Sequence, residues 1–263
     1  MTYTTLDYEV RDSVAWITFN RPDRFNAMNP VMLRELCDIA NLCSSDRRVR
    51  AAVLTGSGEQ AFCAGGDVSA FAERLDDVDI LVKEMTTYLH AAVSRFARMR
   101  APLIAAVNGV AAGAGLSAVA CCDLAVADEA ATFTSAYTRI GLTPDGSSTH
   151  FLSRLIGPRR AMELYLTNRV LSAAEALDWG LVNQVVPAGT AVAAADKLAR
   201  ELAEGPTAAF GGVKDLMQSA ASESLETQME KETQAIAAAA VSADGQEGIR
   251  AFFDKRAPRF TGG

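Results

Sequence analysis

Two short glycine-rich segments of the chain could bring backbone N–H groups close to a ligand. They are Ala64–Asp67 (AGGD) and Gly113–Gly115 (GAG). Glycine leaves room for another molecule beside the backbone, and the first N–H groups of a helix have no partner within that helix. The stretch Pro102–Asp123 predicts a buried strand, a tight turn at Asn108-Gly109 and then the first turn of a buried helix. We therefore expect both segments to present N–H groups to an anion, which the positive end of the helix dipole would also attract.

A carboxylate with two possible uses stands at Asp145, in the loop segment Gly141–Gly146 (GLTPDG). Aspartate is a common helix N-cap, and a helix is predicted from about Ser147, so a purely structural use is one interpretation. The other is proton transfer, since a single carboxylate can take a proton from one carbon atom and return it to another. The residues alone leave both uses open.

Two further residue types that often do chemistry are scarce or lack partners. His90, one of two histidines, lies in a helix predicted over residues 76–99, where a single histidine is usually a satisfied structural residue. The five cysteines form an odd set without metal-binding spacing, and Cys63 has no evident activating neighbour. The sequence therefore predicts no metal site, and its cysteine usage is typical of a reducing cytosol.

The composition is that of a globular protein of ordinary polarity, with 49% hydrophobic and 22% charged residues among 263. A net charge of −7 and a pI near 5.0 argue against nucleic acid as a partner, because phosphate backbones are bound by clustered Lys and Arg. The longest apolar stretch, residues 102–120, is interrupted by Asn108 and glycines, so no membrane span is expected. The N-terminal residues show no apolar leader, and we expect a cytoplasmic protein.

Strands and helices alternate over the first 190 residues, and only helices follow. Strands are predicted over 13–19, 51–55, 123–127 and 182–186, and the last helices over 191–203, 207–220 and 222–241. This order predicts an α/β core in residues 1–190 and a helical region in residues 191–263. Leu225, Met229 and Ile236 form one apolar stripe on the last predicted helix, which must cover its own domain or a neighbouring subunit.

The segment Gly113–Ala118 formally fits the G-x-G-x-x-G/A fingerprint of dinucleotide-binding proteins. Its context argues against that function, because the next strand is predicted at Asp123, too soon for a βαβ unit of roughly 30 residues. The position about twenty residues after the first glycine is also Phe133 rather than a carboxylate. We therefore expect no redox cofactor.

Blocks of sequence along nearly the whole chain resemble the enoyl-CoA hydratase/isomerase (crotonase) superfamily. They are RPDRFNAMN, AFCAGGDV, PLIAAVNGVAAGAGLSAVACCD, GLTPDG, RRAMELYLTNR and SAAEALDWGLVNQVV. The resemblance is greatest to enoyl-CoA isomerases of the phenylacetate-pathway type, and some features are similar to 4-chlorobenzoyl-CoA dehalogenase. It implies a spiral of ββα units with a C-terminal helical trimerisation region, assembled as a homotrimer or a dimer of trimers.

The resemblance assigns chemical roles to both glycine segments. It implies that the N–H groups of Gly66 and Ala114 form an oxyanion hole around the carbonyl of an acyl-CoA thioester, where an enolate needs preorganised donors. Family hydratases activate water with two glutamates, and the matching positions here hold Ser117 and Tyr137. Neither is a carboxylate, which argues against plain hydration. Asp145 matches the catalytic aspartate of the isomerases.

The resemblance also places coenzyme A, as part of the substrate, along four residues near the first glycine segment. They are Arg24, Ala27, Ala64 and Val68, and the Arg24 side chain could also meet the phosphates. Asp67, beside the first oxyanion donor, is expected to start a helix at the edge of this substrate-binding region. No separate cofactor is implied.

Three remaining positions have a structural interpretation beside a functional one. Tyr137 is expected to line the acyl pocket, and Ser117 to satisfy a nearby backbone group. His90 and Asp145 coincide with the base and the nucleophile of 4-chlorobenzoyl-CoA dehalogenase, in which aspartate attacks an aromatic carbon and histidine activates water.

Together these observations favour an enoyl-CoA double-bond isomerase with Asp145 as the proton shuttle. Enoyl-CoA hydration, hydrolysis similar to that of the dehalogenase, and non-catalytic binding of acyl-CoA are the alternatives. The sequence does not specify whether the acyl group is linear, cyclic or aromatic.

Overall fold

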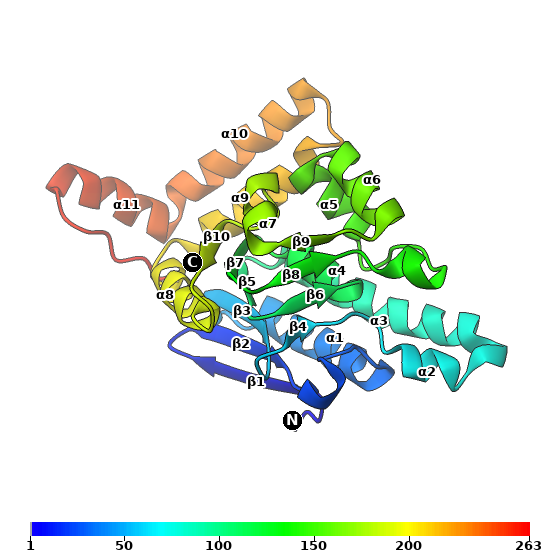
Figure 1. The fold of residues 1–263 in the computed structure, drawn as a ribbon. Helices are drawn as coiled ribbons and strands as arrows, with labels where there is room; N and C mark the ends of the chain where they lie inside the picture. The colour runs from blue at the N-terminus through cyan, green and yellow to red at the C-terminus, as the bar shows by residue number, and fades with distance from the viewer. Residues whose placement is uncertain (1) are drawn as a thin grey trace.

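A six-stranded sheet forms the centre of the computed structural model, which describes residues 2–263 (Figure 1). In spatial order its strands are β1 (Leu6–Arg11), β2 (Val14–Phe19), β3 (Ala51–Gly56), β5 (Leu103–Val107), β7 (Leu124–Asp128) and β10 (Gln184–Val186). β1 pairs antiparallel with β2, and the other neighbouring pairs are parallel. The predicted α/β class is confirmed.

Side chains of this large sheet alternate between two buried faces. In β3, Ala51 and Val53 face one apolar cluster, and the residues between them face the other. The alternation follows from the two-residue period of a strand. The first face is covered by α8 (Ala191–Ala203), so the first helix of the predicted region 191–263 packs on the core. Its buried residues recur at every fourth position and are all small: Ala191, Ala195, Ala199 and Ala203.

A second, four-stranded sheet lies on the other side of the large one. It consists of β4 (Ala61–Cys63), β6 (Val110–Ala112), β8 (Thr132–Thr134) and β9 (Val170–Ser172). β4, β6 and β8 run parallel, and β9 is antiparallel to β8. The rings of Phe19 on β2 and Phe62 on β4 meet edge to face with their centroids 5.5 Å apart, so aromatic packing joins the two sheets.

Three helices complete the main core. α1 (Pro30–Ser45) and α3 (Val78–Arg98) pack side by side, and α4 (Ala114–Cys121) is buried along its whole length. α1 begins after its N-cap Asn29, whose side chain accepts a hydrogen bond from the Met32 N–H at 2.9 Å.

Short elements connect the strands and support the loops of the core. They are the helices α2 (Val68–Ala72), α5 (Ser148–Ile156), α6 (Pro158–Thr167) and α7 (Ala173–Trp179), and the 3₁₀ turns η1 (Pro22–Arg24), η2 (Leu75–Asp77) and η3 (Tyr137–Ile140). α7 begins with a capping box between Ser172 and Glu175, which the S-x-x-E spacing indicates, and ends at Gly180 in the left-handed conformation.

The C-terminal helices are α9 (Thr207–Ala220), α10 (Leu225–Val241) and α11 (Ala243–Asp254). Figure 1 shows α10 and α11 extending away from the body of the molecule. The predicted stripe of Leu225, Met229 and Ile236 is exposed, so it covers nothing within the described chain. The structure also contains β1 and α11, for which the sequence analysis predicts no element.

No helix among residues 2–263 is long and apolar enough to span a membrane. These residues also contain no cluster of His, Cys, Asp and Glu side chains suited to a metal ion. All five cysteines are free thiols.

A buried ion pair joins α9 to the core. The Lys214 ammonium donates to the Asp123 carboxylate at 2.7 Å and to the backbone carbonyls of Phe96 and Ala101 at 3.0 and 3.2 Å. The same carboxylate accepts a hydrogen bond from the Leu103 N–H at 2.7 Å. Burial raises the pKa of Asp123, and the nearby Lys214 charge opposes that rise.

Replacement of Lys214 by Met should destabilise the fold in a pH-dependent way. Breaking a buried pair typically costs about 3–5 kcal/mol, and we expect about 2–4 kcal/mol at pH 7 because the Asp123 side chain is 26% exposed. A carboxyl whose pKa is raised by folding binds its proton more tightly in the folded state. The loss of stability caused by Lys214→Met should therefore shrink as the pH falls from 7 to 5. Urea unfolding at both pH values measures this difference.

The exposed pair of Lys83 and Asp79 on α3 provides the control. Lys83→Met should leave the unfolding midpoint almost unchanged, because exposed ion pairs contribute little. An equal effect of the two substitutions would contradict a structural role for the Lys214 pair.

Candidate active site

The two glycine segments meet because the strands before them are neighbours. β4 and β6 are parallel and adjacent, and parallel strands end at the same edge of a sheet. Gly65 follows β4 and Gly113 follows β6, both with positive φ, at 99° and 52°. A Cβ atom on Gly65 would lie 2.9 Å from the carbonyl oxygen of Ala112 and 3.3 Å from the nitrogen of Ala114. Only glycine therefore permits this close approach of the two turns.

Both expected oxyanion donors have free N–H groups. The Met28 N–H donates to the Gly65 carbonyl oxygen at 2.7 Å, and the Asp67 N–H donates to the Met28 carbonyl oxygen at 2.9 Å. Gly66 is therefore the middle residue of a parallel bridge to Met28. The N–H of such a middle residue points away from its partner. The Ala114 N–H is the first of α4 and has no partner within that helix. Among residues 2–263, no backbone carbonyl accepts a hydrogen bond from the N–H of Gly66 or of Ala114.

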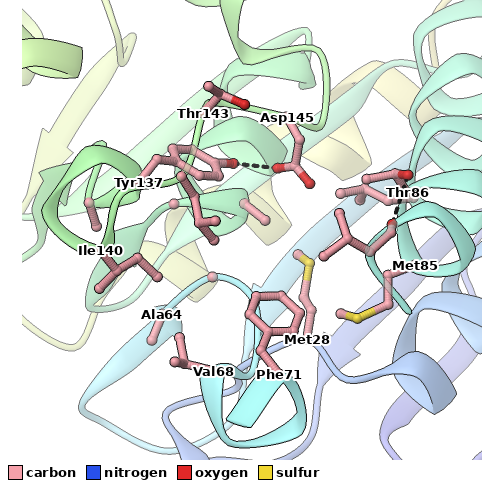
Figure 2. Close-up of a pocket in the computed structure, with 18 of the residues that line it drawn as sticks. Met28, Ala64, Val68, Phe71, Met85, Thr86, Tyr137, Ile140, Thr143 and Asp145 are labelled. Carbon is pink, nitrogen blue, oxygen red and sulfur yellow. Dashed lines mark hydrogen bonds between the residues drawn. The ribbon is translucent and has the colours of Figure 1, made fainter. Parts of the chain in front are cut away.

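The residues of both donors lie at a common cavity of about 330 Å³, and Figure 2 shows a close-up of its lining. Gly66 and Ala114 both line it, and Ala64 and Val68 lie along the same wall. The rest of its lining is mainly apolar and includes Met28, Leu33, Phe71, Val82, Met85, Leu89, Ile140 and Leu142. Such a cavity with a few convergent polar groups is typical of a small-molecule site.

A single carboxylate, that of Asp145, lies in the described lining of this cavity. The Tyr137 hydroxyl donates a hydrogen bond to Asp145 Oδ1 at 2.6 Å, as Figure 2 shows. Burial and the neighbouring Asp145 charge raise the pKa of Tyr137, so this tyrosine stays protonated and remains the donor. The hydrogen bonds of residues 2–263 include none to Asp145 Oδ2, which leaves that oxygen available to a ligand.

Ser117 extends this network from α4. Its Oγ lies 3.0 Å from the Tyr137 hydroxyl and 3.0 Å from the backbone carbonyl oxygen of Asp145. The two positions at which family hydratases carry glutamates therefore hold a hydroxyl pair attached to Asp145. The N-cap interpretation of Asp145 is wrong, because the N-cap of α5 is Ser147. Asp145 accepts a hydrogen bond from this helix only through its backbone carbonyl, from the Ser148 N–H at 3.1 Å.

Three of the expected substrate-binding residues lie outside the cavity lining. Asp67 is the N-cap of α2, as expected, and also pairs with Arg21 at 2.9 Å. The Ala27 carbonyl accepts a hydrogen bond from the same arginine at 2.5 Å. Arg24 is exposed in the turn η1.

His90 also lies outside the cavity lining. Its ring Nε2 accepts a hydrogen bond from the Gly146 N–H at 3.2 Å, so the ring supports the loop that carries Asp145. Accepting at Nε2 places the proton of the neutral ring on Nδ1. Cys63 is fully buried below the first glycine segment, and burial raises its pKa to about 12, so it stays a thiol as expected.

Part of the cavity wall consists of residues that carry no functional signal in the sequence. Met85 and Leu89 are buried residues of α3, in the helix predicted over residues 76–99, and they line the cavity. Met28 lies in a polar turn and Phe71 in the five-residue helix α2, and both segments are too short for an apolar period to show which side chain faces a cavity. Arg21, which holds the Asp67 side chain, was missed because its role exists only through contacts that form on folding.

Comparison with known proteins places these features in a family. The sequence model described as enoyl-CoA hydratase/isomerase matches residues 9–263. The 1,2-epoxyphenylacetyl-CoA isomerase of Escherichia coli is 38% identical over 254 residues, which cover 96% of this chain and 97% of that protein. A probable enoyl-CoA hydratase of Rhodobacter capsulatus is 40% identical over 263 residues, the full length of both. The 4-chlorobenzoyl coenzyme A dehalogenase-2 of an Arthrobacter species is 39% identical over 234 residues, 89% of this chain and 84% of that protein.

The fold has close counterparts among solved structures. The crystal structure of an enoyl-CoA hydratase from Bacillus anthracis matches with a TM-score of 0.92 at 31% identity, covering 99% of this chain and 100% of that chain. The expected crotonase fold is thereby confirmed. Given this fold and a family match that spans nearly all of the sequence, the chain belongs to the enoyl-CoA hydratase/isomerase family.

Proposed function

We propose that this protein is an enoyl-CoA isomerase that moves a carbon–carbon double bond along the acyl chain. The observation that carries the proposal is one carboxylate, Asp145, in the lining of an apolar cavity that is also lined by Gly66 and Ala114, whose N–H groups have no backbone partner. Double-bond migration needs one group that removes and returns a proton, and donors for the charge that develops in between.

The two N–H groups would act on the thioester carbonyl. Removal of a proton from the acyl chain next to the double bond or the carbonyl forms a dienolate, whose negative charge collects on the thioester oxygen. Donors fixed in a water-poor cavity stabilise that charge without having to reorganise, and one such donor is typically worth about 10²- to 10³-fold in rate. The carbonyl reforms when the proton is returned at the other carbon.

Asp145 would carry this proton. Tyr137 holds Oδ1, so the free Oδ2 is the oxygen that takes the proton from one carbon and delivers it to the other. The apolar walls limit exchange of the carried proton with water. No metal and no separate cofactor enters this mechanism.

Hydration and dehalogenation fit the arrangement less well. Water addition by the family mechanism uses two carboxylates, and Ser117 and Tyr137 instead bond to each other and to Asp145. Release of a product by hydrolysis requires a base facing the substrate, whereas His90 Nε2 is engaged with the Gly146 N–H outside the lining. Non-catalytic binding would leave the placement of Asp145 without a use.

The acyl group that this cavity favours is uncharged and apolar. No Lys or Arg side chain contributes to its described lining, and its carboxylate would repel another anion. Burying an acyl carboxylate there without a partner would be costly.

We also propose that the protein assembles as a homotrimer or a dimer of trimers in the cytoplasm. Large apolar side chains, including Leu225, Ile236, Phe252 and Phe253, are exposed on α10 and α11. Apolar surface of this kind is normally covered by another protein surface, and helical C-terminal regions serve that purpose in trimers of this fold. The five free thiols fit a reducing compartment.

The Asp145→Asn variant should bind a saturated acyl-CoA as tightly as the wild type but isomerise a 3-enoyl-CoA about 10²- to 10⁴-fold more slowly. Asparagine keeps the size of the side chain and cannot act as a base. Mass spectrometry of the product measures the rate, and the same assay in D₂O should show product that partly retains the substrate proton.

The matched control is Asp178→Asn, which removes an exposed carboxylate of α7 and should leave the rate unchanged. Addition of water to crotonyl-CoA that is faster than isomerisation would contradict the proposed reaction. An unchanged rate for Asp145→Asn would instead favour a binding protein without catalysis by this residue.

Charge on the acyl tail should lower turnover strongly. We expect kcat/KM for a 3-enoyl-CoA with a terminal carboxylate to be at least about 10-fold below that of the unsubstituted chain, because the cavity lacks a cation. The methyl ester of the same tail is the control for size and should recover most of the activity. A preference for the carboxylate over its ester would refute the predicted substrate class.

A further inference from the structure

The ion pair between Arg21 and Asp67 lies next to the cavity but outside its lining. Arg21 Nη2 is 2.9 Å from Asp67 Oδ2, and the side chains are only 17% and 12% exposed. Most of the other ion pairs among residues 2–263 join side chains that are much more exposed than these two. Those pairs do not contact the backbone of the site. Removal of one partner of a pair this buried destabilises the structure around it, because the other charge is left buried without a partner.

One guanidinium holds both strands of the short bridge that orients Gly66. The bridge joins Met28 to Gly66. Arg21 Nη1 donates to the carbonyl of Ala27, the residue before Met28, at 2.5 Å, and Nη2 binds Asp67, the residue after Gly66. Arg21 therefore fixes the two neighbours of the bridge at once.

Arg21 is itself anchored to the core. The backbone N–H of Arg21 donates to Asn26 Oδ1 at 3.0 Å. Asn26 is fully buried, and its side-chain amide donates to the carbonyls of Ser57 and Ala61 at 2.9 and 2.8 Å. The chain of contacts therefore runs from β4 through Asn26 and Arg21 to Asp67. It ends at the residue that directly follows Gly66.

We propose that Arg21 is a positioning residue of the oxyanion hole, which directs the Gly66 N–H through its bonds to Ala27 and Asp67. The inference rests on the proposed role of Gly66 and Ala114 as donors. A guanidinium suits the task because its planar fork reaches two acceptors in fixed geometry, whereas an ammonium group is a single point of charge. Asp67 is the natural partner because its other oxygen is engaged with the Ser69 N–H at the start of α2.

Loss of this contact should lower kcat more than it raises KM. A misplacement of about 1 Å can cost about 10²-fold in rate, because a displaced donor stabilises the developing charge poorly. The substrate binds mainly through other parts of the cavity. We expect kcat to fall about 10- to 100-fold in Arg21→Met and KM to change by less than about threefold.

The decisive measurement is the infrared stretch of a ¹³C-labelled thioester carbonyl in bound hexanoyl-CoA, which cannot isomerise. Donors to the carbonyl oxygen lower its frequency, so the readout reports the oxyanion hole without any reaction. In the wild type the band should move to lower frequency on binding. The shift should be clearly smaller in Arg21→Met and only partly recovered in Arg21→Lys, which keeps the charge but not the fork.

Lys214→Met is the matched control, because it also removes a buried, paired cation and destabilises the fold at a distant point. Its carbonyl shift and kcat should equal those of the wild type. If Arg21→Met does not fold, Asp67→Asn removes the ion pair from the other side and should show the same reduced shift.

The outcomes separate this inference from the proposed function. A full wild-type shift that persists in Arg21→Met and in Asp67→Asn would overturn the positioning role while leaving the oxyanion hole intact. Absence of a shift in the wild type would overturn the oxyanion hole itself, and the positioning role with it.

Discussion

The contact between Gly65 and Gly113 is the constraint on which the rest of the site depends. A Cβ atom on Gly65 would lie 2.9 Å from the Ala112 carbonyl oxygen, whereas Gly113 requires glycine because of its positive φ of 52°. Because Gly65 lacks a side chain, the two turns touch, and the next residue of each, which has a free N–H, lines the same cavity. The spacing of the two donors is thus set by backbone packing, which side-chain motion cannot relax.

The small sheet explains why residues far apart in sequence meet there. β4, β6 and β8 are parallel neighbours, so the chain leaves all three at one edge. The first exit leads to Gly66, the second to Ala114 and the third to Tyr137, which binds Asp145. Open parallel sheets commonly bind ligands outside the carboxyl ends of their strands, and this site follows that rule. α4 begins at the same edge, so its N-terminal N–H serves the site instead of the helix.

Much of this could be predicted from the sequence where a residue type has few alternative uses. Paired glycines after apolar runs indicated the two turns, and the helices predicted over 191–203 and 207–220 have the bounds of α8 and α9. Strands of three residues, such as β4 and β8, are too short to show a period, so the small sheet was missed. β1 (LDYEVR) alternates apolar and polar residues over only six positions, and α11 contains Gly245 and Gly248, which are poor helix formers. Arg21 could not be found, since its role exists only through contacts that folding creates.

The central claim, that the Ala114 N–H stabilises negative charge on the thioester oxygen, is tested most directly by deleting that N–H alone. Replacement of Ala114 by lactic acid turns the amide into an ester, keeps the methyl group and the shape of the turn, and removes only the hydrogen-bond donor. Protein made by the same route with alanine at position 114 is the reference, and kcat for a 3-enoyl-CoA is compared at saturating substrate. Our account predicts a loss of about 10²- to 10³-fold with an unchanged affinity for saturated acyl-CoA. A loss of less than about threefold relative to the reference would contradict it, because one such donor is typically worth far more.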